Sequence, residues 1–310
     1  MKKIFVAVMA MAAFAACSTE EQIAAPKGQE IAFGDAFVDN ATKAIYGNTE
    51  GSLLNEFQVW GNLTGNDSTV QLYNGATVSR EGEAYGQPWS CDVTRYWTPS
   101  CEYEFVAIAH AKSVTLGEDH LPETITYEAD GDKDLLLSNK VAASTNAACV
   151  VTGLNTNNAV AFTMNHLLSK LHFAVNHSLG ADYDVVPTSI QVTGAKKNGT
   201  YTIADTIADG TWAINGDATV GALELLNTDR VIIPGNQTLS VVITYDIKFG
   251  VGAGEKTTIA TGVTKDAELT VDFAKNTAYN VTATIGATAI QFTVDNVAGF
   301  NTPETNVTVQ

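Results

Sequence analysis

The stretch Val241-Val-Ile-Thr-Tyr-Asp-Ile-Lys-Phe249 decides the fold class. Its odd-numbered positions are all apolar or aromatic, whereas Thr244, Asp246 and Lys248 occupy even-numbered positions. Alternation with a period of two is typical of a β-strand that buries one face, and Val, Ile, Thr and Tyr are residues that strands favour. The stretch therefore predicts a half-buried strand.

The same alternation recurs along the chain, and turn-forming residues separate the runs. Short strands divided by Gly, Asn and Asp are typical of an all-β sandwich. The other alternating runs are Leu171-Phe173-Val175, Leu269-Val271-Phe273, Tyr279-Val281-Ala283-Ile285 and Ile290-Phe292-Val294. The predicted turns include Gly61, Gly65-Asn66-Asp67, Asn74-Gly75, Asn198-Gly199, Asn215-Gly216-Asp217 and Gly250-Val251-Gly252.

The length of 310 residues is sufficient for two domains of ordinary size. A small and polar segment covers residues 142–158 and ends in Asn155-Thr-Asn-Asn158. We place the boundary there, which predicts an N-terminal β-sandwich at residues 44–158 and a C-terminal β-sandwich at residues 159–310.

The N-terminus has the pattern of an export signal. Lys2 and Lys3 precede an apolar run at residues 4–16, which is too short to span a membrane. The end of this run and the next residue, Phe14-Ala-Ala-Cys17, look like a lipobox, in which the cysteine becomes the acylated first residue. Residues 1–16 are therefore expected to be a signal peptide and Cys17 the lipidation site. The alternative is an ordinary secretory signal that happens to contain a cysteine.

The charge balance excludes one class of partner. The formal net charge is −17, from 17 basic and 34 acidic residues. Such a field repels the phosphates of nucleic acids and the headgroups of anionic lipids. The sequence therefore indicates that the protein binds no nucleic acid.

Two segments have a superficial likeness to ligand-binding loops. Residues 250–257 contain three glycines and Lys256, but a phosphate loop needs Gly directly before the Lys, and here Glu255 intervenes. Asp130, Asp132 and Asp134 match the start of a calcium loop, but the Gly and Glu that complete it are missing. We interpret the first segment as a hairpin turn and the second as a solvated acidic turn.

No pattern of catalytic or metal-binding residues is found. His166, His172 and His177 have no carboxylate at the spacing of a helical zinc site, and neither a nucleophile elbow nor a Cys–His pair is present. The sequence therefore predicts a protein that is not an enzyme and that has no cofactor and no metal site.

Three cysteines follow Cys17, so one of them stays unpaired inside the chain. Cys91 and Cys101 flank a plausible turn, and an exported protein could join them by a disulfide. Three separate thiols, with Cys149 as the third, are the alternative.

A series of fragments resembles the fimbrillins, also called type V pilins. The resemblance covers most of the chain, and the order and spacing of the fragments carry it. They are Glu30-Ile-Ala-Phe33, Val38-Asp-Asn-Ala-Thr-Lys43-Ala44, Trp89, Tyr96-Trp-Thr-Pro99, Tyr103-Glu-Phe105-Val-Ala107, Asp134-Leu-Leu-Leu137, Phe162-Thr-Met-Asn-His166-Leu-Leu-Ser-Lys-Leu171-His-Phe173, Gly210-Thr-Trp212, Ile232-Ile-Pro234 and Leu239-Ser-Val-Val-Ile243-Thr-Tyr245.

The resemblance implies two tandem transthyretin-like β-sandwiches behind a lipoprotein signal peptide. It also implies a structural subunit of cell-surface fimbriae that supports adhesion and is anchored in the outer membrane as a precursor. Residues 17–43 would be a lipidated propeptide that contains a removable first strand around Ile31 to Val38. A trypsin-like protease would cut between Lys43 and Ala44. The best-known cut in the family follows Arg, so the Lys at this position is a departure.

The same resemblance implies assembly by strand exchange between subunits. The run through Ile290, Phe292 and Val294 is expected to complete this chain's own second domain. The tail after Pro303 would then serve as the donor strand for a neighbour, although a normal final strand packed in its own sandwich is the alternative. The donor residues are Thr305, Asn306, Val307, Thr308, Val309 and Gln310.

A second function from another class is a tip adhesin or carbohydrate-binding surface lipoprotein. Such a protein would present exposed rings, and Trp60, Trp89 and Trp97 are the candidates. The expected partners are other fimbrial subunits, the outer membrane, the processing protease and a host glycan or protein receptor.

Overall fold

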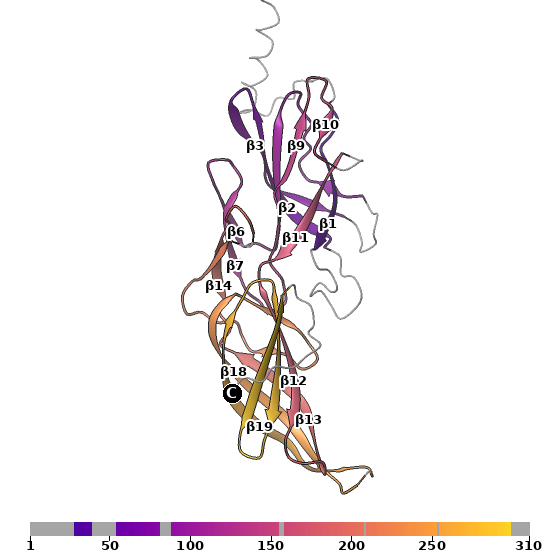
Figure 1. Ribbon diagram of the computed structural model, residues 1–310, viewed down its shortest axis with the longest axis vertical. Coiled ribbons are helices and arrows are strands. Elements are labelled where there is room, and N and C mark those ends of the chain that lie inside the picture. Colours follow the sequence, from indigo (N-terminus) through magenta and orange to yellow (C-terminus); the bar gives the residue numbers. More distant parts are fainter. Residues whose placement is uncertain are drawn as a thin grey trace, which may run out of the picture.

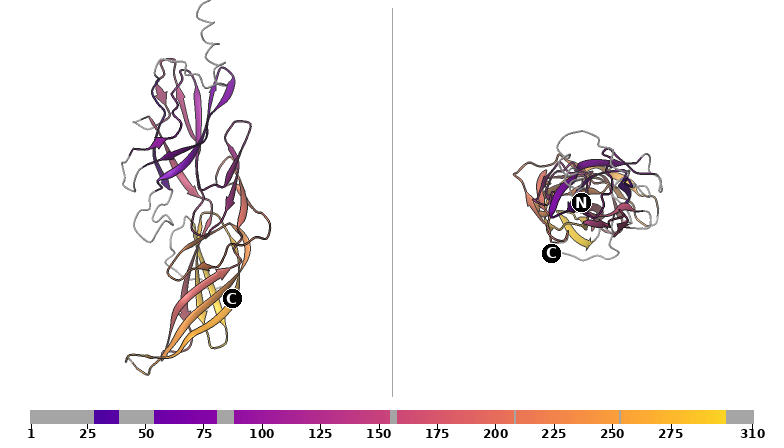
Figure 2. Two further views of the ribbon diagram at one scale, coloured as in Figure 1. Left: turned by 180° about the vertical axis from the view of Figure 1, so that it is seen from behind. Right: turned by 90° about the horizontal axis from the view of Figure 1, so that it is seen from above.

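The computed structural model describes residues 28–38, 54–80, 88–154, 158–207, 209–252 and 254–298, and every helix or strand assigned in them is a β-strand. The predicted all-β class is therefore confirmed. The strands form four sheets along an elongated body, which has a rounded outline when seen from above (Figures 1 and 2). Within these ranges there is no helix of the length and apolarity needed to cross a membrane.

The first sheet occupies one end of the body and has the order β1-β11-β8-β5-β2-β3-β4, with β9 pairing both β5 and β10 (Figure 1). It contains all described strands from the first half except one hairpin. Its strands are β1 (Ala32–Val38), β2 (Glu56–Gly65), β3 (Ser68–Ser79), β4 (Ser90–Cys91), β5 (Glu102–Ala109), β8 (Leu136–Ser138), β9 (Val141–Thr145), β10 (Val151–Thr152) and β11 (Ala159–His166).

Two four-stranded sheets enclose the core at the other end, with the orders β17-β12-β20-β21 and β16-β13-β18-β19. The stretch 241–249 lies within β18, where Val241, Ile243 and Tyr245 are buried as the alternation predicts. The four other alternating runs also lie in strands. The elements are β12 (Ser169–His177), β13 (Tyr183–Thr193), β16 (Leu223–Glu224), β17 (Arg230–Ile232), β18 (Gly235–Phe249), β19 (Thr257–Phe273), β20 (Thr277–Ile285) and β21 (Ile290–Ala298).

The fourth sheet combines one hairpin from each half of the chain. It consists of β6 (Ser113–Leu116), β7 (Pro122–Glu128), β14 (Asn198–Thr202) and β15 (Thr211–Ile214), in the order β15-β14-β7-β6. Strands β7 and β14 are antiparallel, with Tyr127 opposite Gly199. A separate apolar cluster packs beneath this sheet and includes Trp60, Ile125, Tyr201 and Ile233. The two halves therefore share both backbone hydrogen bonds and a core.

These pairings bear on the predicted domain boundary near residue 158. Strand β11 begins at Ala159 but belongs to the first sheet, and the chain enters the second end only at Ser169. The β7–β14 pair also joins residues from both sides of 158. The division into residues 44–158 and 159–310 stays a prediction.

A carboxylate on the shared sheet has a strongly perturbed pKa. Hydrogen bonds from Lys112 and Lys197 lower the pKa of Glu128 to about 2. Because the pKa in the folded chain lies below the usual value, this group favours folding above its usual range, and its contribution is lost as the pH falls toward 2. The carboxylate is exposed, so solvent and salt screen the effect.

Some of the predicted turns are confirmed, and others lie inside strands. The Gly65-Asn66-Asp67 turn joins β2 and β3, with positive φ at Asn66 and Asp67 as a two-residue hairpin requires. The turns at 215–217 and 250–252 are also confirmed. Three predicted turns are wrong, because Gly61, Asn74-Gly75 and Asn198-Gly199 lie inside strands. Gly75, at φ 72°, forms a bulge in β3 where the register with β2 shifts.

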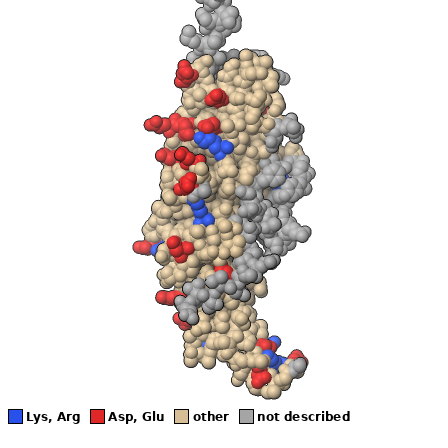
Figure 3. Space-filling model, in the orientation of Figure 1, with Lys and Arg blue, Asp and Glu red and all other residues tan. Residues whose placement is uncertain are grey.

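Acidic side chains outnumber basic ones on the visible face and gather along one flank of the first half (Figure 3). Most of the remaining surface on this face is uncharged (Figure 3). The distribution agrees with the net charge of −17.

Candidate functional site: the groove of the first strand

Strand β1 closes one edge of the first sheet, where it lies beside β11 (Figure 1). The two strands run parallel, with Ala32 opposite Ala159. Parallel neighbours cannot be joined by a tight hairpin, so β1 is held by segments that are distant in the sequence. The sequence predicted a strand around Ile31 to Val38, and a strand is confirmed at Ala32–Val38.

The residues just before β1 are held from the opposite side. The Ile31 amide donates a hydrogen bond of 2.9 Å to the carbonyl of Arg95, and the Trp97 amide donates one of 3.0 Å to the carbonyl of Gln29. At Gly28 a Cβ atom would lie only 2.6 Å from the Trp97 carbonyl oxygen, so this close approach requires glycine. We call the space that residues 28–38 occupy, between β11 and residues 95–97, the first-strand groove.

Two apolar side chains anchor β1 in the core. Ile31 is 2% exposed and Phe33 is 7% exposed. The centroid of the Phe33 ring lies 5.5 Å from that of Tyr73, 6.3 Å from that of Phe162 and 6.4 Å from that of Phe105. Burying an aliphatic or aromatic side chain of this size contributes about 1.5–3 kcal/mol. The first-strand groove therefore has two pockets, one that takes the aliphatic side chain of Ile31 and one, lined by aromatic rings, that takes Phe33.

Replacing Phe33 with Ala should weaken the hold on β1 without changing the fold. Removing a large buried ring costs about 3–5 kcal/mol at a site that cannot collapse. We expect the free energy for detaching β1 to fall by roughly that amount. The measurement is hydrogen exchange at the Ile31 amide, which is protected by its bond to Arg95.

Phe249→Ala is the matched control, because this phenylalanine also lies in a strand but is 37% exposed. It should leave exchange at Ile31 unchanged. Equal protection of Ile31 in the Phe33→Ala and Phe249→Ala variants would contradict the anchoring role of Phe33.

Sequence analysis found β1 itself but not the walls of its groove. Arg95, Tyr73, Phe105 and Phe162 come from four different segments, and their convergence depends on sheet topology. The strand was expected from the resemblance to fimbrillins, which does not say what its buried side chains contact.

The other residues of the predicted assembly lie outside the described ranges. These are Cys17, the Lys43–Ala44 bond and the donor residues 305–310. The residues around the cut follow β1 and precede β2 in the chain. Strand β21 is described, and it pairs with β20 along its whole length, from Thr277 opposite Ala298 to Ile285 opposite Ile290. The run therefore pairs with a strand of this chain's own second half, as expected, whereas a separate second sandwich domain stays a prediction.

The three histidines noted in the sequence are not brought together. His166 is buried and bonds through Nδ1 to the buried carboxylate of Asp134, whereas His172 Nδ1 lies 2.7 Å from Asp229 Oδ1. Both partners are remote in the sequence, which explains why spacing did not reveal them. His177 lies at the far end of β12. In the described ranges no cluster of three metal-binding side chains is found.

The two segments that resemble ligand-binding loops have other roles in the structure. Residues 250–252 and 254–256 lie between β18 and β19, and Lys256 donates to the carbonyl of Ala181 at 2.8 Å and to Asp184 at 2.8 Å. Asp130 accepts two backbone amides in a turn, as interpreted. The prediction is wrong for Asp134, which is 1% exposed because its partner is the buried His166.

The tryptophans do not form a platform of exposed rings. Trp60 and Trp97 belong to the cores, so their proposed contact with sugars is wrong. Trp89 is half-buried, with the Arg80 guanidinium carbon 4.8 Å from its ring centroid. Packing explains all three residues.

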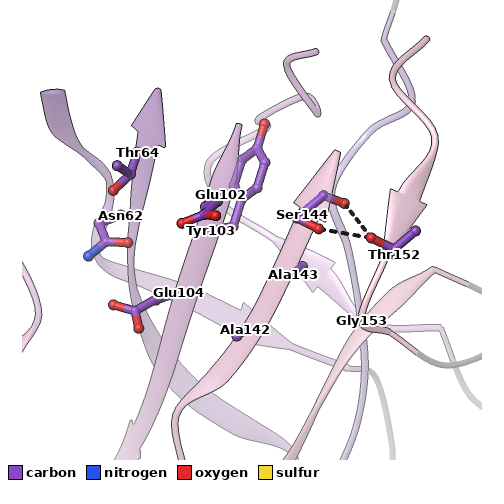
Figure 4. Close-up of a pocket in the computed structure, with 10 residues that line it drawn as sticks. All are labelled: Asn62, Thr64, Glu102, Tyr103, Glu104, Ala142, Ala143, Ser144, Thr152 and Gly153. Atoms are coloured by element: carbon purple, nitrogen blue, oxygen red, sulfur yellow. Dashed lines mark hydrogen bonds between the residues drawn. The ribbon is translucent and has the colours of Figure 1, made fainter. Parts of the chain in front are cut away.

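A shallow pocket lies on the first sheet over β2, β5, β9 and β10 (Figure 4). Polar side chains from neighbouring strands line it, among them Asn62, Glu102, Glu104 and Ser144. Its one aromatic residue, Tyr103, is 1% exposed and therefore offers no ring face to a sugar. The pocket shows no arrangement of groups that would bind a particular ligand.

The cysteines Cys91, Cys101 and Cys149 are free thiols in this structure. The sequence left two alternatives, a Cys91–Cys101 disulfide or three separate thiols. The structure has the three separate thiols. Burial raises the pKa of the Cys101 thiol, which makes it less reactive as a thiolate.

Known proteins share the fold of this chain, and a known family matches its sequence. A solved structure of a candidate cell adhesion protein from Bacteroides uniformis has a TM-score of 0.53 at 15% identity, over 86% of this chain and 97% of that one. A fimbrial protein from Bacteroides vulgatus has a TM-score of 0.49 at 16% identity, over 88% and 99% of the two chains. At these identities the likeness of the first structure supports the fold alone. No curated protein sequence is a significant match.

A family model described as fimbrillin-like matches residues 42–297. The match includes every described strand except β1 and the last residue of β21. Membership implies contact with other fimbrial subunits in a fimbrium at the cell surface, and it points to a structural role rather than a catalytic one. The chain belongs to the fimbrillin-like family and is a fimbrial subunit.

Proposed function

We propose that this subunit polymerises by strand exchange after proteolysis and forms part of the fibre shaft. The observation that carries the proposal is the position of β1, at the edge of a sheet and paired only with segments distant in the sequence. One cut between β1 and β2 would leave β1 bound by non-covalent contacts alone. It could then depart as a unit.

The proposed cut lies between Lys43 and Ala44. This bond follows Val38, the last residue of β1, and precedes β2. A cut after Lys27 would leave β1 attached to the rest of the chain and open no groove. The processing enzyme would be a trypsin-like protease that accepts Lys.

Departure of β1 would create a strong acceptor for another strand. The edge of β11 and the backbone of residues 95–97 would lose their partners, and an exposed strand edge readily pairs with a strand from another chain. The pockets of Ile31 and Phe33 would open at the same time. The donor would be residues 305–310 of a neighbouring subunit, since β21 already completes this chain's own sheet.

Two buried atoms beside β1 favour its replacement. Within the described ranges, the Tyr73 hydroxyl and the Trp97 indole nitrogen have no hydrogen-bond partner. A buried polar group without a partner costs about 1–3 kcal/mol. A donor strand that offers them partners would bind more tightly than β1, and this difference would favour exchange.

A lipid anchor at Cys17 is compatible with cleavage and strand exchange in that order. Acylated Cys17 would hold the precursor in the outer membrane, and the cut after Lys43 would separate the mature subunit from its lipid. The exported fibre would then support adhesion to a host glycan or protein.

Changing Lys43 to Gln should block maturation, because a trypsin-like enzyme needs a positive side chain before the cut. We expect fibre subunits of the wild type to begin at Ala44 when sequenced from the N-terminus. The variant should accumulate as an uncut precursor without fibres. Lys27→Gln is the matched control and should assemble normally.

Fibres of normal length from the Lys43→Gln variant would contradict the proposed cut. Wild-type fibre subunits that begin at or before residue 31 would do the same, because they would retain β1.

A further inference from the structure

The two pockets of the first-strand groove differ in the side chain that they take. Phe33 fills the second pocket, and three aromatic rings lie within 6.4 Å of its own ring centroid. At 7% exposure the ring is almost entirely enclosed. A close-packed site of this kind loses stability when a smaller side chain leaves part of it empty.

The second half of the chain has a similar pair of side chains on an inner strand of its sheet. Strand β12 runs parallel to β20 and carries Leu171 and Phe173, which are 0% and 3% exposed. The Phe173 ring packs against that of Phe292 at 6.4 Å. Both ends of the molecule therefore bury an aliphatic residue and, two positions later, a phenylalanine on a parallel strand.

The chain's own tail does not offer this pair. Its only apolar residues two positions apart are Val307 and Val309. A valine would face the aromatic pocket whether the tail entered parallel or antiparallel to β11. Phe300 is no substitute, because the residue two positions before it, Ala298, is paired with Thr277 in its own sheet.

We infer that the first-strand groove selects donor strands with an aromatic residue at the Phe33 position, and that its preferred donor is the strand of a different fimbrial subunit. The inference rests on the proposed strand exchange and adds the chemistry of the partner. The partner strand has the pattern aliphatic-x-aromatic if it enters parallel to β11, and aromatic-x-aliphatic if it enters antiparallel. This chain's own valine tail is the weaker occupant of this groove, so mixed pairs form in preference to pairs of identical subunits.

Competition between synthetic strands tests the inference on the intact chain cut once after Lys43. A labelled peptide of residues 28–38 is exchanged for the cut chain's own first strand, and unlabelled peptides then displace it. The competitors are the same peptide, its Phe33→Val variant, the tail peptide 303–310, and the Val307→Phe and Val309→Phe variants of the tail. Thr308→Phe is the matched control, because it adds the same ring on the opposite face of the strand.

We expect the Phe33→Val peptide to bind about tenfold or more weakly than the native one. One of the two Val→Phe tail peptides should bind about tenfold more tightly than the native tail, and Thr308→Phe should gain nothing. The variant that gains also gives the direction of the donor strand.

The inference is overturned if Phe33→Val binds as tightly as the native peptide, or if neither Val→Phe variant gains over the tail. In either case the proposed strand exchange would still be supported, provided that the native first-strand peptide binds. If no peptide binds, the native first strand included, strand exchange itself fails and the inference with it.

Discussion

Deleting residues 305–310 is expected to leave a folded monomer that no longer polymerises after the cut. The reason is that the sheet β17-β12-β20-β21 already has all its strands without them. Strand β21 covers the edge of β20 and ends at Ala298, and its residues Phe292 and Val294 pack against the second core. In an assay with one type of subunit, the tail is the only proposed donor, so its loss removes assembly altogether.

Sedimentation and circular dichroism after limited proteolysis measure this result. The double change Val307→Ser and Val309→Ser should have the same effect as the deletion, whereas Thr308→Ser should assemble normally. Truncated chains that form fibres of normal length would show that the tail is not the donor. Unfolding of the truncated chain would instead make the tail a core strand of its own sandwich.

Local patterns in the sequence were sufficient for the fold class. Alternation in residues 241–249 predicted β18 and the burial of Val241, Ile243 and Tyr245, because the period of a strand depends only on neighbouring residues. The prediction was wrong for Phe249, which is 37% exposed at the end of the strand. The predictions from Asn-Gly pairs were less dependable. Asn74-Gly75 and Asn198-Gly199 lie inside strands, since the positive φ of Gly75 serves a bulge and Gly199 lies close to the Trp212 ring.

Long-range pairings could not be predicted in this way. The parallel register of β1 with β11 and the sharing of one sheet by β7 and β14 join segments that are far apart in the sequence. Periodicity gives each strand a buried face but not a neighbour. The partners of His166 and His172 were missed for the same reason.

The candidate site was predictable in part. The resemblance to fimbrillins placed a removable strand near Ile31 to Val38, and the structure has β1 there. It did not supply the aromatic pocket of Phe33 or the backbone bonds to residues 95–97, which depend on the packing of several segments. These contacts are what make β1 a separate unit that proteolysis could release.

The most direct test of strand exchange is the number of first strands that remain in assembled fibres. The intact chain is cut after Lys43, monomers are separated from polymers, and the peptide that contains residues 28–38 is quantified by mass spectrometry in each. The account predicts about one such peptide for each monomer and almost none for each subunit within a polymer, where a donor strand has replaced it. Polymers that retain one first strand for every subunit would contradict it.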